Sequence, residues 1–205
     1  MTMSMGKQES GFMTLKIELL HTGIKRTVVL PDDISLAKLN DVIQAVIGLN
    51  DCHPWVFEKD GSVVCSAEES LARATRRRAR TLAAASAMRV SSLLKKRGDA
   101  MTYTYDLDDR WIHRITRMAD AKCTSPKCLK TQGTMCIEDL GGPWGFLDFL
   151  LDLKDYDANE RHRLGTDFKE LLKWSGFGKK KLRKEFLLGP TCDDVTKLLE
   201  QSPGM

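Results

Sequence analysis

Two short strand patterns flank an acidic turn in the stretch that decides the fold, Met101-Thr-Tyr-Thr-Tyr-Asp-Leu-Asp-Asp-Arg-Trp-Ile-His-Arg-Ile115. The first half alternates strictly between large side chains and threonine, which is typical of a half-buried strand. Trp111 to Ile115 alternates less cleanly, and the run from Asp106 to Arg110 separates the two halves. The stretch therefore predicts an antiparallel β-hairpin.

Further strands and helices are indicated on both sides of this hairpin. The helix over residues 35–47 has the clearest signals, with Ser35 as its N-cap and Gly48 as the residue that ends it. Residues 121–143 contain Pro, Gly and Cys and are interpreted as a loop. The other predicted strands cover residues 14–20, 26–30 and 54–58, and the other predicted helices cover 144–153 and 161–174. We therefore expect a single α+β domain, an antiparallel sheet with helices packed mainly on one face.

The bulk composition is that of an ordinary globular protein. The 205 residues include 32 Lys and Arg against 28 Asp and Glu, a net charge of +4, and 42% are hydrophobic. These values exclude a wholly disordered chain, a collagen-like repeat and a fibrous coiled coil. No window approaches about eighteen uninterrupted apolar residues and no signal-peptide core is evident, so we expect a cytoplasmic protein without a membrane partner. The six cysteines are then expected to be free thiols or metal ligands.

The small net charge hides a strong segregation of charge along the chain. Residues 70–98 contain nine Lys and Arg and no acid, and residues 173–184 contain six and no acid. Such runs suit a partner that carries phosphates, although a solvated face is the alternative. Residues 62–88 lack an apolar stripe and are expected to form an exposed basic helix or a disordered insertion, unless compensating frameshifts produced the stretch. The candidate nucleic-acid contacts are Arg73, Arg76, Arg77, Arg78, Arg80, Lys179, Lys180 and Lys181.

A set of histidines and carboxylates could supply acid–base or metal chemistry: His53, Asp106, Asp109, His113, Glu138 and Asp139. An enzyme would need His53, Asp109, His113 and Glu138 to converge on one substrate. In the structural alternative the two hairpin aspartates cap the turn, His113 lies in the sheet, and Glu138-Asp139 stabilises a helix start. The structural alternative is favoured because no nucleophile–base spacing is present.

The cysteine-containing loop invites a zinc interpretation through Cys123, Cys128 and Cys136. Structural zinc sites usually show two close pairs of ligands, whereas this loop offers one wide pair and a single Cys. Incidental thiols are therefore favoured, and no cofactor is predicted because the chain has no phosphate-binding loop motif. Trp144 and Phe146 are interpreted as core anchors rather than as a ligand platform.

Three segments carry a resemblance to a known family: Gly48-Leu-Asn-Asp-Cys-His53, Tyr105-Asp-Leu-Asp-Asp-Arg-Trp-Ile-His113 and Glu138-Asp-Leu-Gly-Gly-Pro-Trp-Gly-Phe146. They are similar, in this order, to segments of the plasmid pRiA4b Orf-3-like proteins, and the resemblance covers residues 12–176. Asp108 replaces a Gly of the family pattern. Trp55 and Cys136-Ile137 also depart from it, as does the basic stretch. Residues 177–205 match poorly and are expected to be a divergent basic C-terminal tail.

The resemblance implies an accessory protein of mobile elements, since members of the family are found on plasmids and as passenger proteins of transposons, where some are labelled resolvase-like. Together with the basic segments it leads to our first hypothesis, a non-enzymatic binding module with nucleic acid as its partner. A metal-dependent or acid–base enzyme and a protein-binding adaptor are the alternatives.

Overall fold

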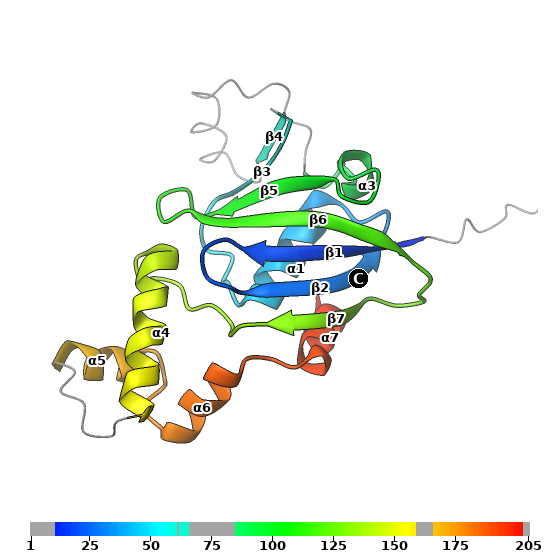
Figure 1. Ribbon diagram of the computed structural model, residues 1–205. Helices are drawn as coiled ribbons and strands as arrows, with labels where there is room; N and C mark the ends of the chain where they lie inside the picture. Colours follow the sequence, from blue (N-terminus) through cyan, green and yellow to red (C-terminus); the bar gives the residue numbers. More distant parts are fainter. Residues whose placement is uncertain (1–10, 61, 66–84, 159–165, 203–205) are drawn as a thin grey trace, which may run out of the picture.

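The molecule is built on one antiparallel sheet (Figure 1). The computed structural model describes residues 11–60, 62–65, 85–158 and 166–202. Within them the sheet has seven strands in the order β4-β3-β5-β6-β1-β2-β7. The strands are β1 (Phe12–Leu19), β2 (Lys25–Pro31), β3 (Trp55–Lys59), β4 (Ser62–Cys65), β5 (Ala100–Tyr105), β6 (Trp111–Ala121) and β7 (Lys127–Gln132). The helices are α1 (Leu36–Ile47), α3 (Val90–Leu93), α4 (Gly142–Ala158), α5 (Thr166–Trp174), α6 (Lys180–Leu188) and α7 (Cys192–Gln201).

The central hairpin forms as its alternation predicts. Tyr105 pairs with Trp111 and Tyr103 pairs with His113 across β5 and β6. All four of these side chains are buried, so they lie on the face of the hairpin that the helices cover. Asp106, with φ of 53°, begins the turn between the two strands.

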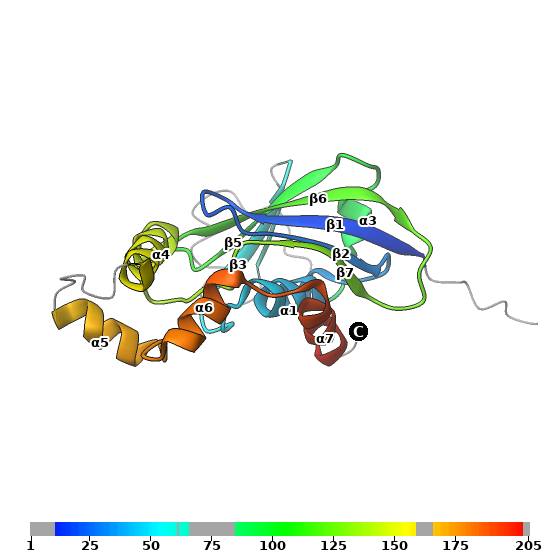
Figure 2. The ribbon, with the colours of Figure 1, turned by 60° about the horizontal axis from the view of Figure 1, so that its bottom comes forward.

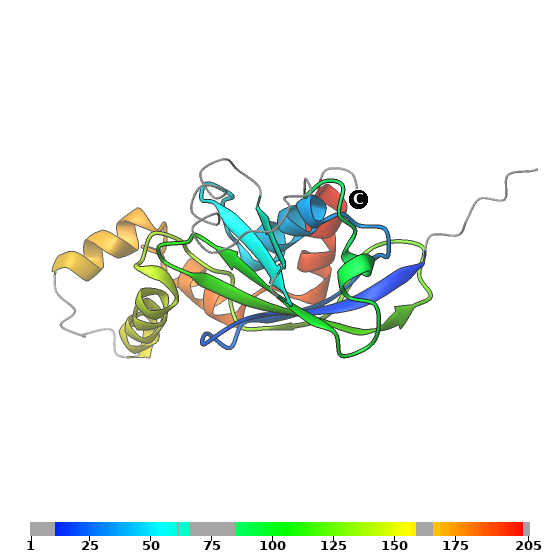
Figure 3. The same ribbon diagram turned by 90° about the horizontal axis from the view of Figure 1, so that it is seen from above.

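Helix α1 covers the middle of the sheet and has the predicted ends. The hydroxyl of Ser35 accepts the backbone N–H of Lys38, and Gly48 ends the helix at φ of 95°. Figures 2 and 3 show α1 and α7 side by side on one face of the sheet, and none of the helices in the described residues lies across the opposite face. The α+β architecture with helices mainly on one face is therefore confirmed.

The apolar side chains form one main core and a smaller second one. In the main core the inward side of β1 meets the apolar side of α1, with Leu15 and Ile17 in the same buried cluster as Leu39 and Ile43. The second cluster lies among α4, α5 and α6, beyond one end of the sheet (Figure 1). Its buried members are Phe149, Leu153, Phe168 and Leu172.

Several elements differ from the sequence-based expectations. The interval 121–143 is not all loop, because it contains β7 at the edge of the sheet. Two helices form after Gly176, where the helical pattern is weak. One of them, α7, packs against β7 and α1 and buries Val195 and Leu199 completely.

Trp144 and Phe146 are both expected in the core, but only one of them is buried. Phe146 is fully buried, as a core anchor should be, whereas Trp144 is 65% exposed. The indole lies in the first turn of α4 and stacks on His21 in the β1–β2 turn, with ring centroids 5.4 Å apart. The interpretation of Trp144 as a core anchor is therefore wrong, because Trp144 lies on the exposed side of α4 while Phe146 and Leu150 of the same helix are buried in the main core.

The arginine candidates of the basic segment, Arg73, Arg76, Arg77, Arg78 and Arg80, lie outside the described residues. Most of the predicted insertion, residues 62–88, and part of the predicted helix over 161–174 lie there too. In the described part of the chain, no helix is both long and apolar enough to cross a membrane.

Candidate functional site

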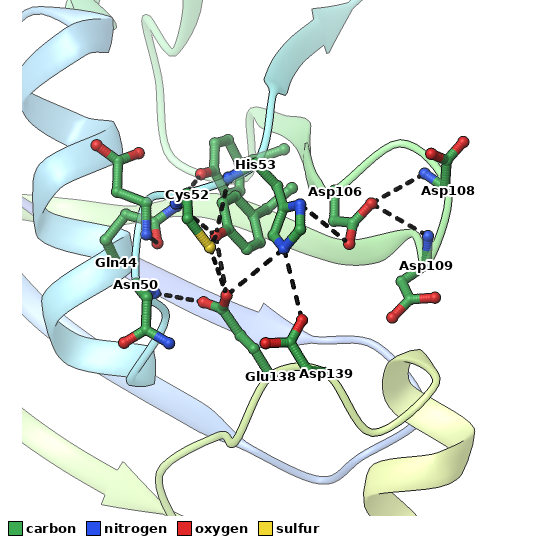
Figure 4. Close-up of polar contacts among 12 residues, drawn as sticks. Gln44, Asn50, Cys52, His53, Asp106, Asp108, Asp109, Glu138 and Asp139 are labelled. Atoms are coloured by element: carbon green, nitrogen blue, oxygen red, sulfur yellow. Dashed lines mark hydrogen bonds and ion pairs between the residues drawn. The ribbon is translucent and has the colours of Figure 1, made fainter.

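Three segments that are distant in sequence meet at one end of the sheet. They are residues 50–53 after α1, the turn from Asp106 to Asp109 between β5 and β6, and Glu138-Asp139 before α4 (Figure 4). The carboxylates of Asp106, Glu138 and Asp139 lie around the imidazole of His53, whereas those of Asp108 and Asp109 lie apart from it (Figure 4).

The His53 imidazole has a carboxylate on each side of the ring. Nδ1 lies 3.7 Å from Oδ2 of Asp106. Nε2 lies 3.7 Å from Oδ1 of Asp139 and 4.0 Å from Oε2 of Glu138. The side chain is one-third exposed and stands edge-on to the ring of Tyr105. Nε2 therefore lies near the carboxylates of Glu138 and Asp139, at a position that is partly open to solvent.

Glu138 is the most buried acid of this group and accepts several hydrogen bonds. Its side chain is only 2% exposed. Oε1 accepts the backbone N–H of Asn50. Oε2 accepts the hydroxyl of Tyr105 at 3.1 Å and the thiol of Cys52 at 3.3 Å. Donors from three places thus fix the orientation of this carboxylate.

Tyr105 and Cys52 are held in their protonated forms next to Glu138. Burial, with the hydrogen bond to Cys52 as the second cause, raises the pKa of Tyr105 well above its usual range. For Cys52 the hydrogen bond from Tyr105 lowers the pKa, but burial and the hydrogen bond to Glu138 outweigh it and the pKa is raised. Without a cation nearby, Cys52 is therefore a thiol rather than a thiolate nucleophile.

Helix α1 positions the Cys52-His53 segment through a buried polar network. Oε1 of Gln44 accepts the backbone N–H of Asp51 at 2.9 Å, and Nδ2 of Asn40 donates to the Asp51 carboxylate at 3.1 Å. Tyr103 ties this network to the sheet, since its hydroxyl donates to Asn40 at 2.6 Å. Asp51 itself has a φ of 52°, a left-handed conformation that Asp tolerates better than most residues.

A buried arginine positions the segment that leads to Glu138. The guanidinium of Arg26 on β2 donates to the carbonyl oxygens of Val46, Gln132 and Thr134 at 2.9, 2.7 and 2.6 Å. It therefore joins α1, β7 and the following loop. The backbone N–H of Cys136 then donates to the carbonyl of Ile47 at 2.7 Å, which brings the chain to Glu138.

Asp106 combines both roles considered for it from the sequence. Its Oδ1 accepts the backbone N–H groups of Asp108 and Asp109 at 3.1 and 3.3 Å, which caps the hairpin turn. Its other oxygen, Oδ2, faces His53. Asp109 contributes to the turn through its backbone, and its carboxylate lies apart from the imidazole (Figure 4).

His113 does not join the site. It is fully buried in the sheet, its ring lies 5.3 Å from that of Tyr103, and neither ring nitrogen has a well-formed hydrogen bond to any residue that the structure describes. Burial lowers the pKa of His113 to about 4, so it is neutral in the core. The set His53, Asp109, His113 and Glu138 is therefore not brought together. The set that does converge is His53, Asp106, Glu138 and Asp139.

The cysteines selected from the loop do not meet one another. Cys123 donates its thiol to the carbonyl of Ser125, and Cys136 lies in the core, where burial raises its pKa. Cys128 on β7 lies beside Cys192 instead, and the hydroxyl of Thr196 bonds to the backbones of both. The metal-compatible thiol that the sequence reasoning missed is Cys52. Its position directly before His53 was the available signal.

Among the described residues, Cys52, His53 and Glu138 form a group that could hold a metal ion. One ligand atom from each, the thiol sulfur, an imidazole nitrogen and a carboxylate oxygen, lie within 4.8 Å of one another. Cys52 is exposed, His53 is half-buried and Glu138 is buried, so the group spans the boundary between the core and solvent.

These features define a single-sheet α+β protein with a Cys/His/carboxylate cluster at one end of the sheet. The chain belongs to the plasmid pRiA4b ORF-3-like protein family, whose model matches residues 12–181. An uncharacterised protein of Sinorhizobium fredii, y4hQ, is 33% identical in an alignment of 169 positions, and the alignment covers 79% of each chain. The crystal structure of a protein of unknown function from Methanosarcina mazei Go1, MM3350, has a similar fold, with a TM-score of 0.61. It is 22% identical, and the match covers 82% of this chain and 90% of that one.

Proposed function

We propose that this protein binds a divalent transition-metal ion, with zinc the best fit, through Cys52, His53 and Glu138. The single observation that carries the proposal is that the three ligand atoms already lie within 4.8 Å of one another. A thiolate, an imidazole and a carboxylate are the three kinds of protein ligand that zinc accepts. Hard cations such as Mg²⁺ prefer oxygen ligands, so the sulfur argues against them.

The separations between the ligand atoms support a tetrahedral arrangement. With metal–ligand bonds of about 2.0–2.3 Å, ligand atoms around zinc lie about 3.3–3.7 Å apart. Cys52 Sγ is 3.3 Å from Glu138 Oε2, and His53 Nε2 is 4.0 Å from the same oxygen. The third separation, between Cys52 and His53, is also within 4.8 Å, so the imidazole would have to move closer to the other two ligands to share an ion with them.

The surroundings of the ligands also suit a metal. A histidine that binds metal through one nitrogen usually has its other nitrogen against a carboxylate or carbonyl, and Asp106 stands 3.7 Å from Nδ1 of His53. Asn50 and Tyr105 orient Glu138 in the same supporting way. An ion would also favour the Cys52 thiolate, whose proton would leave on binding.

The fourth coordination position is left to solvent or to Asp139. Oδ1 of Asp139 is 3.7 Å from His53 Nε2, and its side chain is 65% exposed and able to turn toward or away from an ion. A zinc ion with one water ligand lowers the pKa of that water to about 7. Metal-assisted hydrolysis is therefore the reaction class that such a centre would support.

Titration with cobalt(II), followed by its thiolate charge-transfer absorption, tests the proposal. Chelator-treated protein should bind one equivalent, show the absorption band and lose it when zinc is added. Cys52→Ser should abolish the band, and Glu138→Gln should weaken binding. The matched control is Cys123→Ser, which removes another accessible thiol whose partner is the Ser125 carbonyl. A band that persists in Cys52→Ser, or no saturable binding below about 10 μM cobalt, would refute the proposal.

A nucleic-acid surface is a second candidate function, and one observation favours it. Lys179, Lys180 and Lys181 are exposed at the start of α6, and Trp174, 59% exposed, ends the preceding helix α5. An exposed aromatic ring beside several cations suits single-stranded nucleic acid, because bases stack on the ring while lysines contact phosphates. Such binding would also suit the accessory role on mobile elements that the family resemblance implies.

Binding to a single-stranded oligonucleotide at several salt concentrations tests this second candidate. Replacing Lys179, Lys180 and Lys181 by Ala should reduce the slope of log affinity against log salt by about 2, since each phosphate contact contributes about 0.7. The matched control replaces three exposed lysines elsewhere in the described chain, Lys122, Lys127 and Lys130. An equal loss in both triple variants would show that only the net charge matters.

A further inference from the structure

Cys128 and Cys192 meet where the C-terminal helix packs against the edge of the sheet. Cys128 lies on the edge strand β7 and is 7% exposed, and Cys192 is the first residue of α7 and is half-buried. One hydroxyl joins their backbones. Thr196 Oγ1 accepts the N–H of Cys128 at 3.0 Å and donates to the carbonyl of Cys192 at 2.8 Å. The two residues are therefore adjacent across an interface between elements that are distant in sequence.

The two thiols also lie close enough for one to affect the titration of the other. The Cys128 thiol donates to the carbonyl of Lys130 at 3.5 Å. Burial first, and the side chain of Cys192 second, raise the pKa of Cys128 to about 12. Cys128 is thus the protected thiol of the pair, while Cys192 is the one that a reagent in solution reaches first.

We propose that Cys128 and Cys192 are a redox modification site, which forms a reversible disulfide that fixes α7 to β7. The oxidant class is a low-molecular-weight disulfide. The Cys192 thiolate attacks one sulfur of that disulfide and releases one thiol. The Cys128 thiolate then attacks Cys192 in the mixed disulfide and releases the second thiol. The two protons from the cysteines end on the two released thiols, so the exchange is balanced.

The packing around the pair holds it in place whether or not the bond exists. The hydroxyl of Thr131 on β7 donates to the carbonyl of Pro190 at 2.9 Å, just before α7. A capping box between Thr191 and Asp194 fixes the first turn of α7. A disulfide needs closely spaced Cα atoms, and these contacts keep the first turn of α7 against β7, where the two cysteines lie.

The site is independent of the proposed metal centre. The backbones of Cys128 and Cys192 both bond to the Thr196 hydroxyl, whereas Cys52 contacts Tyr105 and Glu138. The cross-link would close a loop that contains Glu138 and Asp139 together with α4, α5 and α6. Oxidation would therefore restrain the part of the chain that supplies two of the site carboxylates.

Peptide mapping of the full chain after equilibration in glutathione redox buffers tests this inference. In oxidised glutathione, with chelator present, we expect one intramolecular link between the peptides that contain Cys128 and Cys192, with loss of two hydrogens and recovery on return to reduced glutathione. Cys192→Ser should abolish the link, and Cys123→Ser should keep it. The melting temperature should rise on oxidation in the wild-type chain and not in Cys192→Ser. Glutathione adducts without this link, or a link between other cysteines, would overturn the inference.

Discussion

Replacing Asp106 by Asn tests the metal proposal at the carboxylate that supports its histidine ligand. Asn keeps one side-chain oxygen, which can still accept the backbone N–H groups of Asp108 and Asp109 that cap the turn. It also tolerates the left-handed φ of 53° at this position. The change is confined to the atom opposite Nδ1 of His53, where an anionic acceptor becomes an amide donor.

The expected loss of metal affinity is about 10- to 100-fold, the usual effect of removing such a supporting carboxylate. It corresponds to about 1.4–2.7 kcal/mol of binding free energy. The turn hydrogen bonds survive, so the free energy of unfolding without metal should change by no more than about 0.5 kcal/mol. Competition with a chromogenic chelator gives the affinity, and thermal unfolding of the metal-free protein gives the stability.

Asp109→Asn is the matched control, because it removes the same charge from the same turn at a carboxylate that lies apart from His53 (Figure 4). It should change affinity less than about threefold, by long-range electrostatics alone. Two results would refute the reasoning: an unchanged affinity in Asp106→Asn, or equal losses in both variants. The first would mean that Asp106 only caps the turn, and the second that only net charge matters.

Three further outcomes follow from residues outside the metal centre. The pKa of His113 is about 4 in the fold and 6.5 in the unfolded chain, so the unfolded chain binds the extra proton as pH falls from 6.5 to 4. The free energy of unfolding should fall by about 3 kcal/mol over that pH window in the wild-type chain, and this fall should be absent in His113→Leu. Urea unfolding at several pH values would measure it. Gly142→Ala would place Cβ 2.7 Å from a carbonyl oxygen of the β5–β6 turn at φ of +72° and should cost about 2–3 kcal/mol. Gly141→Ala, with a similar φ but open space, should cost about 1 kcal/mol in the same assay. Closing the loop between Cys128 and Cys192 should raise stability by about 4 kcal/mol, and calorimetry that shows no increase would contradict an unstrained link.

The strands and the helix that the sequence predicts best are those with one buried side and one exposed side, because such elements have a regular hydrophobic pattern. β5 and β6 keep their period because one face of the hairpin is buried under helices, and α1 has both a cap and an apolar stripe. β7 was missed because an edge strand has little to bury. Of its six residues only Cys128 is buried, and its exposed lysines are typical of an edge that avoids further pairing.

α7 was missed for a different reason. Its buried residues are few, with Val195 and Leu199 one helical turn apart, and the apolar pattern of so short a helix is weak. The readable signal was the capping box, Thr191 followed three residues later by Asp194. Local chemistry at the helix start was thus more informative here than hydrophobic periodicity.

The sequence predicts the types of residue in the candidate site, but it does not predict which individual residues come together. Glu138 meets Cys52 across 86 positions of sequence, and such a meeting depends on how the loops cross the end of the sheet. His113 and Asp109 carry suitable chemistry, but strand register turns His113 into the core. Cys52 is not predictable from cysteine spacing, because it has no nearby cysteine and its partners come from distant segments of the chain.

In both Asp106 and Glu138, one carboxylate oxygen has a structural role and the other lies in the cluster around His53. Oδ1 of Asp106 completes the hairpin turn, yet a turn does not require Oδ2 to face His53. Oε1 of Glu138 accepts the Asn50 N–H after α1, yet that role does not require Oε2 to meet a thiol and an imidazole. Hydrogen bonds from Tyr105 and Cys52 hold Oε2 of Glu138 on the Nε2 side of His53, and Oδ2 of Asp106 faces the Nδ1 side of the same ring. The two oxygens would therefore have different roles in the proposed metal site, because the Glu138 oxygen would bind the ion while the Asp106 oxygen would support the histidine.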